Sequence, residues 1–133
     1  LTQTISEVLA RSIPLFGVCL GLQGIVEYFG GTLDTLTYPM HGKCSTIKVL
    51  NKEDLFAGLG EEFKAGRYHS LYARLSAIPD ELAVTAVSED GIVMAVAHKT
   101  LPIQAVQFHP ETILSLSNQA GLKIIINLMN GVN

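Results

Sequence analysis

The chain has 133 residues, with nine Lys and Arg against twelve Asp and Glu, a formal net charge of −3 and 48% hydrophobic residues. This length and composition predict one globular domain over residues 1–133, and they exclude disordered and fibrous chains. The scattered charges form no basic patch, so we expect no nucleic-acid partner. No apolar run approaches the ~20 residues of a membrane span, so we expect no membrane association.

The first third of the chain predicts two helices with a strand between them. Apolar residues at helical spacing predict helices over 4–12 and 20–29. Between them, the short apolar run 15–18 is typical of a buried parallel strand. Pro14 ends the first helix, and the Gly30-Gly31 pair ends the second.

The rest of the chain predicts strands and a closing helix. β-Branched and apolar residues predict four strands, over 45–50, 82–87, 92–98 and 103–108. A turn at 89–91 joins the middle two as a hairpin, and a helix is expected over 121–129. Helices that alternate with apolar strands, followed by an antiparallel insertion, indicate an α/β fold with a mostly parallel sheet.

The start of the chain, LTQTISEVLARS, has neither a Met nor the basic and apolar regions of a signal peptide. We therefore expect the chain to be part of a longer protein. Two cysteines, Cys19 and Cys44, without a secretory signal predict free thiols and a cytoplasmic location.

One of these cysteines stands between two glycines where a predicted strand meets a predicted helix. The segment Gly17-Val18-Cys19-Leu20-Gly21 matches a nucleophile elbow with Cys in the place of Ser. Crowding at such a turn favours glycine, and one of the two glycines is expected to need a backbone angle that a Cβ would forbid. The helix N-terminus favours a thiolate at Cys19, and the N–H of Leu20 would face an oxyanion beside the sulfur. The alternative is a small buried thiol without a chemical role.

A thiol nucleophile needs a base, and His109 follows the predicted strand 103–108 at the sheet edge where Cys19 is also expected. Pro110 favours an extended His109, so Glu111 points the same way and can hold the imidazole. The pattern predicts Cys19 as nucleophile, His109 as base and Glu111 as the residue that orients the base. FHPE alone would instead suggest a strand-end histidine beside a solvated carboxylate.

The other histidines have no assigned role in catalysis. His69 is expected to be a packed loop residue, and His98 is expected to face solvent. His41 and Lys43 lie in a predicted loop, where they are either partner contacts or exposed polar residues. The histidines, cysteines and carboxylates show no ligand spacing such as C-x-x-C, so we expect no metal site.

Four segments in order, GVCLGLQ, HGK, GRYHSL and AVQFHPE, resemble the class I (triad) glutamine amidotransferases. Within this family, MHGK, RYHSL and FHPETIL are most similar to the amidotransferase components of anthranilate synthase. Leu22 after CLG is similar to the form that is fused to the synthase. The resemblance implies a flavodoxin-like class I amidotransferase fold that lacks its N-terminal part, because family members begin with further strands and a glycine-rich loop.

The resemblance also implies roles for single residues. Cys19 would attack the side-chain carboxamide of glutamine, His109 would pass the proton to ammonia, and Glu111 would hold His109. The implied substrate-binding residues are Leu20, Gln23, Ser70 and Leu71. Read without the resemblance, Gln23 would be a solvated helix residue and Ser70 a turn former. The glycine-rich loop supplies a second oxyanion donor in the family, and loss of one such donor typically costs ~10²–10³ in rate.

The implied partner is a chorismate-binding anthranilate synthase domain or subunit, fused in the native chain or separate, which would use the ammonia in tryptophan biosynthesis. No cofactor is expected in this domain, and Mg²⁺ is expected only in the synthase. Three alternatives stay open: the amidotransferase of aminodeoxychorismate synthase in folate synthesis, a cysteine hydrolase that works without a synthase, and a folded but inactive domain.

Overall fold

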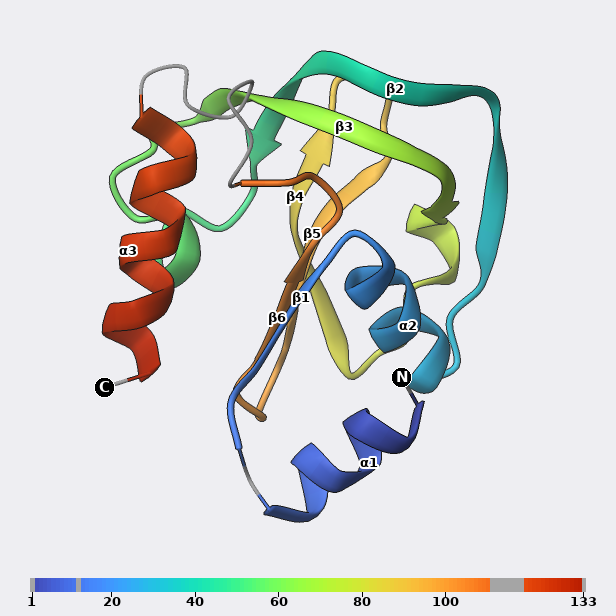
Figure 1. Cartoon of the computed structure of the whole chain (residues 1–133), viewed down its shortest axis with the longest axis vertical. Helices are drawn as coiled ribbons and strands as arrows, with labels where there is room; N and C mark the ends of the chain where they lie inside the picture. The colour runs from blue at the N-terminus through green and yellow to red at the C-terminus, as the bar shows by residue number, and fades with distance from the viewer. Residues whose placement is uncertain (1, 12, 111–118, 133) are drawn as a thin grey trace.

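A computed structural model describes residues 2–11, 13–110 and 119–132, without the side chains of Thr2 and Val132 (Figure 1). The helices are α1 (Thr2–Arg11), α2 (Leu20–Tyr28) and α3 (Ala120–Val132), with short 3-10 turns η1 (Asp54–Phe56) and η2 (Leu75–Ala77). The strands are β1 (Leu15–Val18), β2 (Leu33–Val49), β3 (Glu62–Ala73), β4 (Leu82–Ser88), β5 (Val93–His98) and β6 (Ile103–Val106). Within the described residues these strands form one sheet in the order β1-β6-β5-β4-β2-β3.

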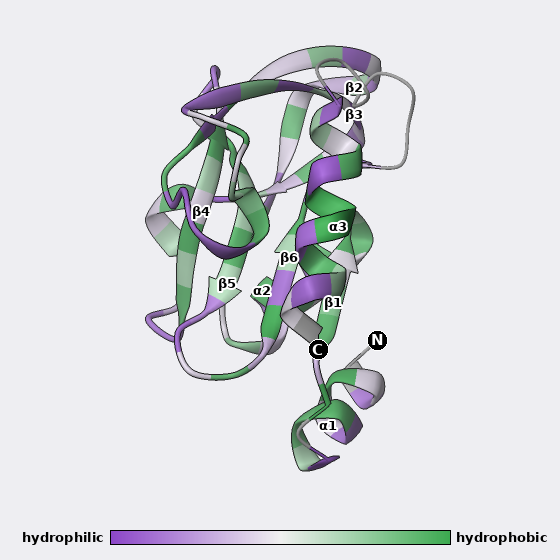
Figure 2. Cartoon of the chain, turned by 90° about the vertical axis from the view of Figure 1, so that its left-hand side faces the viewer, coloured by the Kyte–Doolittle hydropathy of each residue, from purple (hydrophilic) through white to green (hydrophobic). Residues whose placement is uncertain are grey.

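Helices cover both faces of this sheet, as Figure 1 shows. On one face, α1 and α2 bury Ile5, Leu22, Ile25 and Val26 against the strands. On the other face, α3 and η1 enclose an apolar cluster that includes Phe56, Phe63, Phe108 and Ile124. Figure 2 shows mostly hydrophobic colouring along β4 and alternating polar and apolar bands along α3, as expected for a helix with one buried side.

The predicted α/β fold class is confirmed, and the sheet is mixed. Among the described strands, β1 and β6 are the one parallel pair, with Val18 opposite Val106. The pairs β6-β5, β5-β4, β4-β2 and β2-β3 are antiparallel. The antiparallel part is therefore larger than the sequence predicted, because two long strands were not recognised as a pair.

The long pair is β2 with β3, and it contains two segments that the sequence pattern predicted as loops. Met40 pairs with His69, and His41 pairs with Tyr68, so the MHGK and RYHSL segments are cross-strand neighbours. A register shift between His41 and Lys43 accommodates Gly42, whose φ of 74° is a left-handed conformation. His69 is therefore a buried strand residue and not a loop residue.

The remaining predicted elements are confirmed with small changes of boundary. All three helices, β1 and the β4-β5 hairpin occur where the sequence placed them. His98 at the end of β5 is half-buried, because its ring packs against that of Phe29 with the centroids 5.1 Å apart. Its Nδ1 accepts hydrogen bonds from the N–H groups of Thr100 and Leu101. No helix in the described part of the chain is both long and apolar enough to cross a membrane.

Candidate active site

Cys19 lies in a sharp turn between β1 and α2. Its φ is 57° and its ψ is −100°, so the cysteine itself has the left-handed backbone that was expected of a neighbouring glycine. Gly17 and Gly21 do not have positive φ values. Gly17 is needed for space, because a Cβ there would lie 2.8 Å from the backbone carbon of Gly21. The predicted elbow is present, and its strain is at the position of the thiol.

Three strands bring their residues together around this turn. Cys19 follows β1 and its N–H donates to the carbonyl of Val106 at 2.8 Å, so it lies beside the end of β6. β3 passes over the same edge of the sheet (Figure 1), where the Cys19 thiol donates to the carbonyl oxygen of Tyr68 at 3.7 Å. The carboxyl ends of the two parallel strands and the middle of β3 thus form one site.

A cavity of about 260 Å³ opens beside the thiol. Its lining comes from the elbow, from the first turn of α2 and from β3, and consists of Cys19, Leu20, Gln23, Tyr68, His69, Ser70 and Leu71. Leu20, Gln23, Ser70 and Leu71 were all expected here. Leu20 begins α2, so its N–H is one of the first-turn donors that have no acceptor within the helix.

His109 lies two residues beyond Gln107 on the segment that follows β6. Its imidazole packs edge-to-face on the ring of Tyr68, with the two ring centroids 5.7 Å apart. Tyr68 thus contacts both predicted catalytic groups, His109 through its ring and Cys19 through its carbonyl oxygen. Glu111, the predicted orienting carboxylate, lies outside the described residues.

Two buried amides connect the cavity to the sulfur. Gln23 Nε2 donates to the carbonyl oxygen of Leu71 and to Oε1 of Gln107, both at 3.1 Å. Gln107 Nε2 donates in turn to Cys19 Sγ at 3.5 Å. Gln23 is therefore a buried residue of the cavity wall and not a solvated helix residue.

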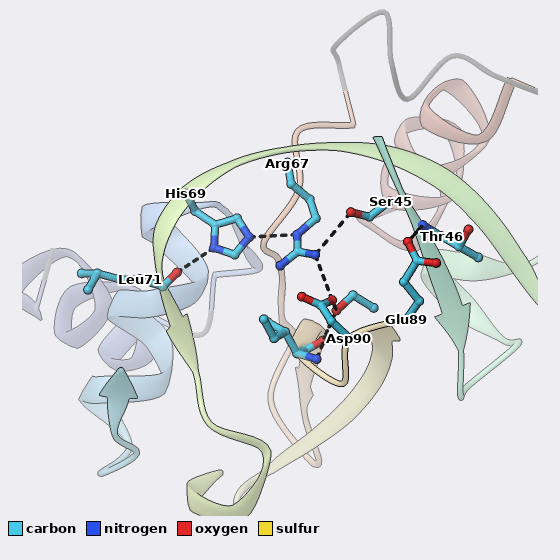
Figure 3. A network of polar contacts seen from close by, with 9 residues as sticks. Ser45, Thr46, Arg67, His69, Leu71, Glu89 and Asp90 are labelled. Atoms are coloured by element: carbon cyan, nitrogen blue, oxygen red, sulfur yellow. Dashed lines mark hydrogen bonds and ion pairs between the residues drawn. The ribbon is translucent and has the colours of Figure 1, made fainter. Parts of the chain in front are cut away.

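A buried ionic network lies behind the same wall, on β3 (Figure 3). Arg67 is 1% exposed, and its Nη1 donates to Asp90 Oδ1 at 3.0 Å and to Ser45 Oγ at 3.3 Å. Its Nε donates to His69 Nε2 at 3.0 Å, and His69 Nδ1 is 2.7 Å from the carbonyl oxygen of Leu71. The network therefore ends at the Leu71 carbonyl oxygen, which also accepts the hydrogen bond from Gln23 Nε2.

The two titratable members of this network have shifted pKa values. Burial lowers the pKa of His69, and the charge of Arg67 lowers it further, against the opposing effects of the Leu71 carbonyl and Asp90. Partial burial raises the pKa of Asp90, but hydrogen bonds from Ser88 and the nearby Arg67 outweigh this and hold it below its usual range. His69 is thus stabilised as a neutral ring and Asp90 as a carboxylate.

Sequence reasoning missed three residues of this site: Arg67, Tyr68 and Gln107. A signal for Gln107 was present, because it is a polar residue between Val106 and Phe108 in an apolar run and needs a hydrogen-bonding partner in the core. Arg67 falls at an inward position of β3, where period-two alternation would predict an apolar residue. Within the described residues, no group of three or more His, Cys, Asp or Glu side chains is placed to hold a metal ion.

A cysteine on a strand-to-helix elbow and a histidine after the adjacent parallel strand, both in contact with Tyr68, form an arrangement typical of cysteine-dependent amidotransferases and hydrolases. The family model for glutamine amidotransferase class-I matches residues 1–127. The chain belongs to this family.

The chain is similar to several relatives and solved structures. It is 57% identical over 127 residues to the anthranilate synthase of Azospirillum brasilense, covering 96% of this chain and 17% of that protein. It is 47% identical over 123 residues to the anthranilate synthase component 2 of Methanocaldococcus jannaschii, covering 88% of this chain and 61% of that protein. A Thermoplasma acidophilum protein assigned to GMP synthase has a similar structure, with a TM-score of 0.86 at 28% identity, over 98% of this chain and 63% of that one. The chain thus spans less than two thirds of the length of each of these proteins.

Proposed function

We propose that this chain is the glutaminase part of an anthranilate synthase, which releases ammonia from glutamine for the amination of chorismate to anthranilate. The observation that carries the proposal is the position of Cys19, on a strained elbow that opens into a cavity lined by Gln23, Ser70 and Leu71. The similarity to anthranilate synthases from two organisms favours this partner reaction over that of aminodeoxychorismate synthase.

The chemistry would begin with attack of Cys19 Sγ on the carboxamide carbon of glutamine. The N–H of Leu20 would donate to the oxyanion that forms beside the sulfur. His109 would carry a proton to the departing nitrogen, so that ammonia leaves and a glutamyl thioester remains. His109 would then activate a water molecule, whose attack releases glutamate and restores the thiol.

The substrate would be held by the cavity wall. Both N–H groups of the Gln23 amide donate within the protein, to Leu71 and Gln107, so its Oε1 is the atom suited to accept from the α-ammonium group of glutamine. Ser70 and Leu71 would bind the amino-acid end of the substrate from β3. Glu111 keeps its proposed role of holding His109.

The ammonia would pass to a chorismate-binding synthase domain or subunit, either fused to this domain or separate. In this proposal residues 1–133 are one partial amidotransferase domain, with no resident cofactor and with any Mg²⁺ in the synthase. A cytoplasmic location is supported by the two free thiols, Cys19 and Cys44, which a reducing compartment preserves.

Labelling with a glutamine-like electrophile tests this function directly. The 133-residue chain is incubated with 6-diazo-5-oxo-norleucine and analysed by intact and peptide mass spectrometry. We expect one adduct on Cys19, none on the exposed Cys44, and protection by excess glutamine. Cys19→Ser is the matched control and should remain unlabelled.

Iodoacetamide labelling of the same samples separates the outcomes. Absence of the diazo adduct, while iodoacetamide still modifies Cys19, would mean that the glutamine pocket does not assemble in this chain and would contradict the proposed function for it. A Cys19 adduct combined with no ammonia release in the presence of any synthase would support a folded but inactive domain.

A further inference from the structure

We propose that Gln107 is a further active-site residue, which donates a hydrogen bond from Nε2 to Cys19 Sγ and is held in that orientation by Gln23. The inference rests on the proposed function, in which Cys19 is the nucleophile. Gln107 gives the sulfur a hydrogen-bond donor from the segment that follows β6.

The direction of each hydrogen bond follows from what each group can donate or accept. The carbonyl oxygen of Leu71 can only accept, so the Gln23 amide must present its nitrogen there, at 3.1 Å. The second N–H of the same nitrogen points to Gln107, which must therefore present its oxygen, also at 3.1 Å. The remaining end of the Gln107 amide, its Nε2, then faces Cys19 Sγ at 3.5 Å.

The same carbonyl is fixed from the opposite side. Arg67 Nε can only donate, so His69 Nε2 must accept, and the proton of the neutral ring is on Nδ1, which donates to the Leu71 oxygen. A chain of hydrogen bonds thus runs from Asp90 through Arg67, His69, Leu71, Gln23 and Gln107 to the sulfur. Figure 3 shows its first half, from Asp90 to Leu71.

Burial makes this donor effective. Gln107 is 0% exposed and Gln23 is 4% exposed, so solvent does not compete for either amide. A hydrogen bond from a fixed amide to a sulfur is stronger when the sulfur is a thiolate, because charge-assisted bonds are roughly twice as strong as neutral ones. Gln107 therefore favours the ionised nucleophile over the neutral thiol.

The test is the pH dependence of Cys19 alkylation. The rate of iodoacetamide modification of Cys19 is followed by peptide mass spectrometry between about pH 5 and pH 10 in the full chain. In Gln107→Leu we expect the midpoint of the profile to rise by about one pH unit and the rate at pH 7 to fall about tenfold. Gln107→Glu keeps an acceptor for Gln23 but places a carboxylate at the sulfur, so it should slow alkylation at least as much.

Gln104→Leu is the matched control, because Gln104 lies on β6 and lines a different cavity, which Pro14 and Leu128 also line. It should retain the parent profile. A folded Gln107→Leu variant with the parent midpoint and rate would overturn the proposal. Iodoacetamide does not need the glutamine pocket, so this result is independent of the diazo labelling that tests the proposed function.

A measurement on the parent chain covers the case in which the buried variants do not fold. The side-chain amide resonances of Gln107 should shift with pH at the midpoint of Cys19 alkylation, and this shift should disappear in Cys19→Ala. Amide resonances that stay constant across the Cys19 transition would also overturn the proposal.

Discussion

At Cys19 a single residue combines a proposed chemical role with a strained backbone conformation. Its φ of 57° lies in the left-handed region, which a residue with a Cβ occupies at a cost of about 1–3 kcal/mol. The geometry lifts the sulfur out of the sheet and toward Tyr68, where the cavity opens. The strain lies at the proposed nucleophile itself, while the glycines at 17 and 21 have no positive φ values.

Because the strain lies at residue 19, two variants that both lack the thiol should differ in their free energy of unfolding. Cys19→Gly removes the Cβ and the strain, whereas Cys19→Ala keeps both. We expect Cys19→Gly to be the more stable of the two by about 1 kcal/mol, after allowance for the greater flexibility of glycine in the unfolded chain. Urea unfolding followed by circular dichroism measures the difference. An alanine variant more stable than the glycine variant would mean that the elbow is unstrained, because alanine loses less conformational freedom on folding than glycine.

At the scale of elements, the close packing of β1 on α2 depends on one glycine and not on the other. A Cβ on Gly17 would lie 2.8 Å from Gly21 and 3.0 Å from Ile25 Cδ1, whereas a Cβ on Gly21 would meet no heavy atom within 4 Å. The strand can therefore lie against the first turn of the helix only when residue 17 has no side chain.

Alanine substitutions at Gly17 and Gly21 should therefore change the free energy of unfolding in opposite directions. Gly17→Ala should lower the free energy of unfolding by about 1–3 kcal/mol, because it overpacks the strand and helix. Gly21→Ala, in the first turn of α2, should raise it by up to about 1 kcal/mol through helix propensity. Thermal melts of the two variants and the parent give the comparison. Equal destabilisation by both would contradict the difference in space at Gly17 and Gly21 on the neighbouring β1 and α2.

The same scale explains which elements could be predicted from the sequence. The helices, β1 and the β4-β5 hairpin carry apolar residues at regular periods, so their patterns were sufficient. β3 was missed because its inward positions change from Phe63 and Ala65 to Arg67 and His69, which makes the strand look like a polar loop. β2 contains Pro39 and Gly42, and its pairing with β3 shifts register around both.

The local elbow pattern predicted the position of Cys19, whereas Gln23, Ser70 and Leu71 were expected in the site only through the family resemblance. Cys19, Leu20, Gln23, Ser70 and Leu71 line one cavity as expected. Gln107 could not be placed, because it bonds residues 88 and 84 positions away. Arg67 could not be placed either, because Ser45 and Asp90, 22 and 23 positions away, belong to β2 and to the β4-β5 turn. Only the three-dimensional fold brings such pairs together.

At the scale of the whole molecule, the ionic network ties β3 to the β4-β5 turn and makes stability depend on pH. His69 has a lowered pKa in the folded chain, so the unfolded chain takes up a proton at its ordinary value of about 6.5 while the folded chain resists it. The unfolded state binds more protons in this window, and stability is therefore lost as the pH falls below about 6.5. Asp90 also has a lowered pKa and adds a second loss at lower pH, as the carboxylate that pairs with Arg67 is protonated.

His69→Gln separates these two contributions, because glutamine cannot titrate but retains one donor and one acceptor for Leu71 and Arg67. The parent should lose stability between about pH 7.5 and pH 5, with a slope that cannot exceed about 1.4 kcal/mol per pH unit for one group. The variant should show a flatter profile in that window and the same loss below about pH 4, where Asp90 titrates.

His41→Gln, on the exposed side of β2, serves as the control and should retain the parent slope, since His41 is outside the network. A His69→Gln profile parallel to that of the parent across the upper window would mean that His69 does not couple protonation to folding. Such a result would contradict the assignment of a neutral His69 ring whose Nδ1–H holds the Leu71 carbonyl.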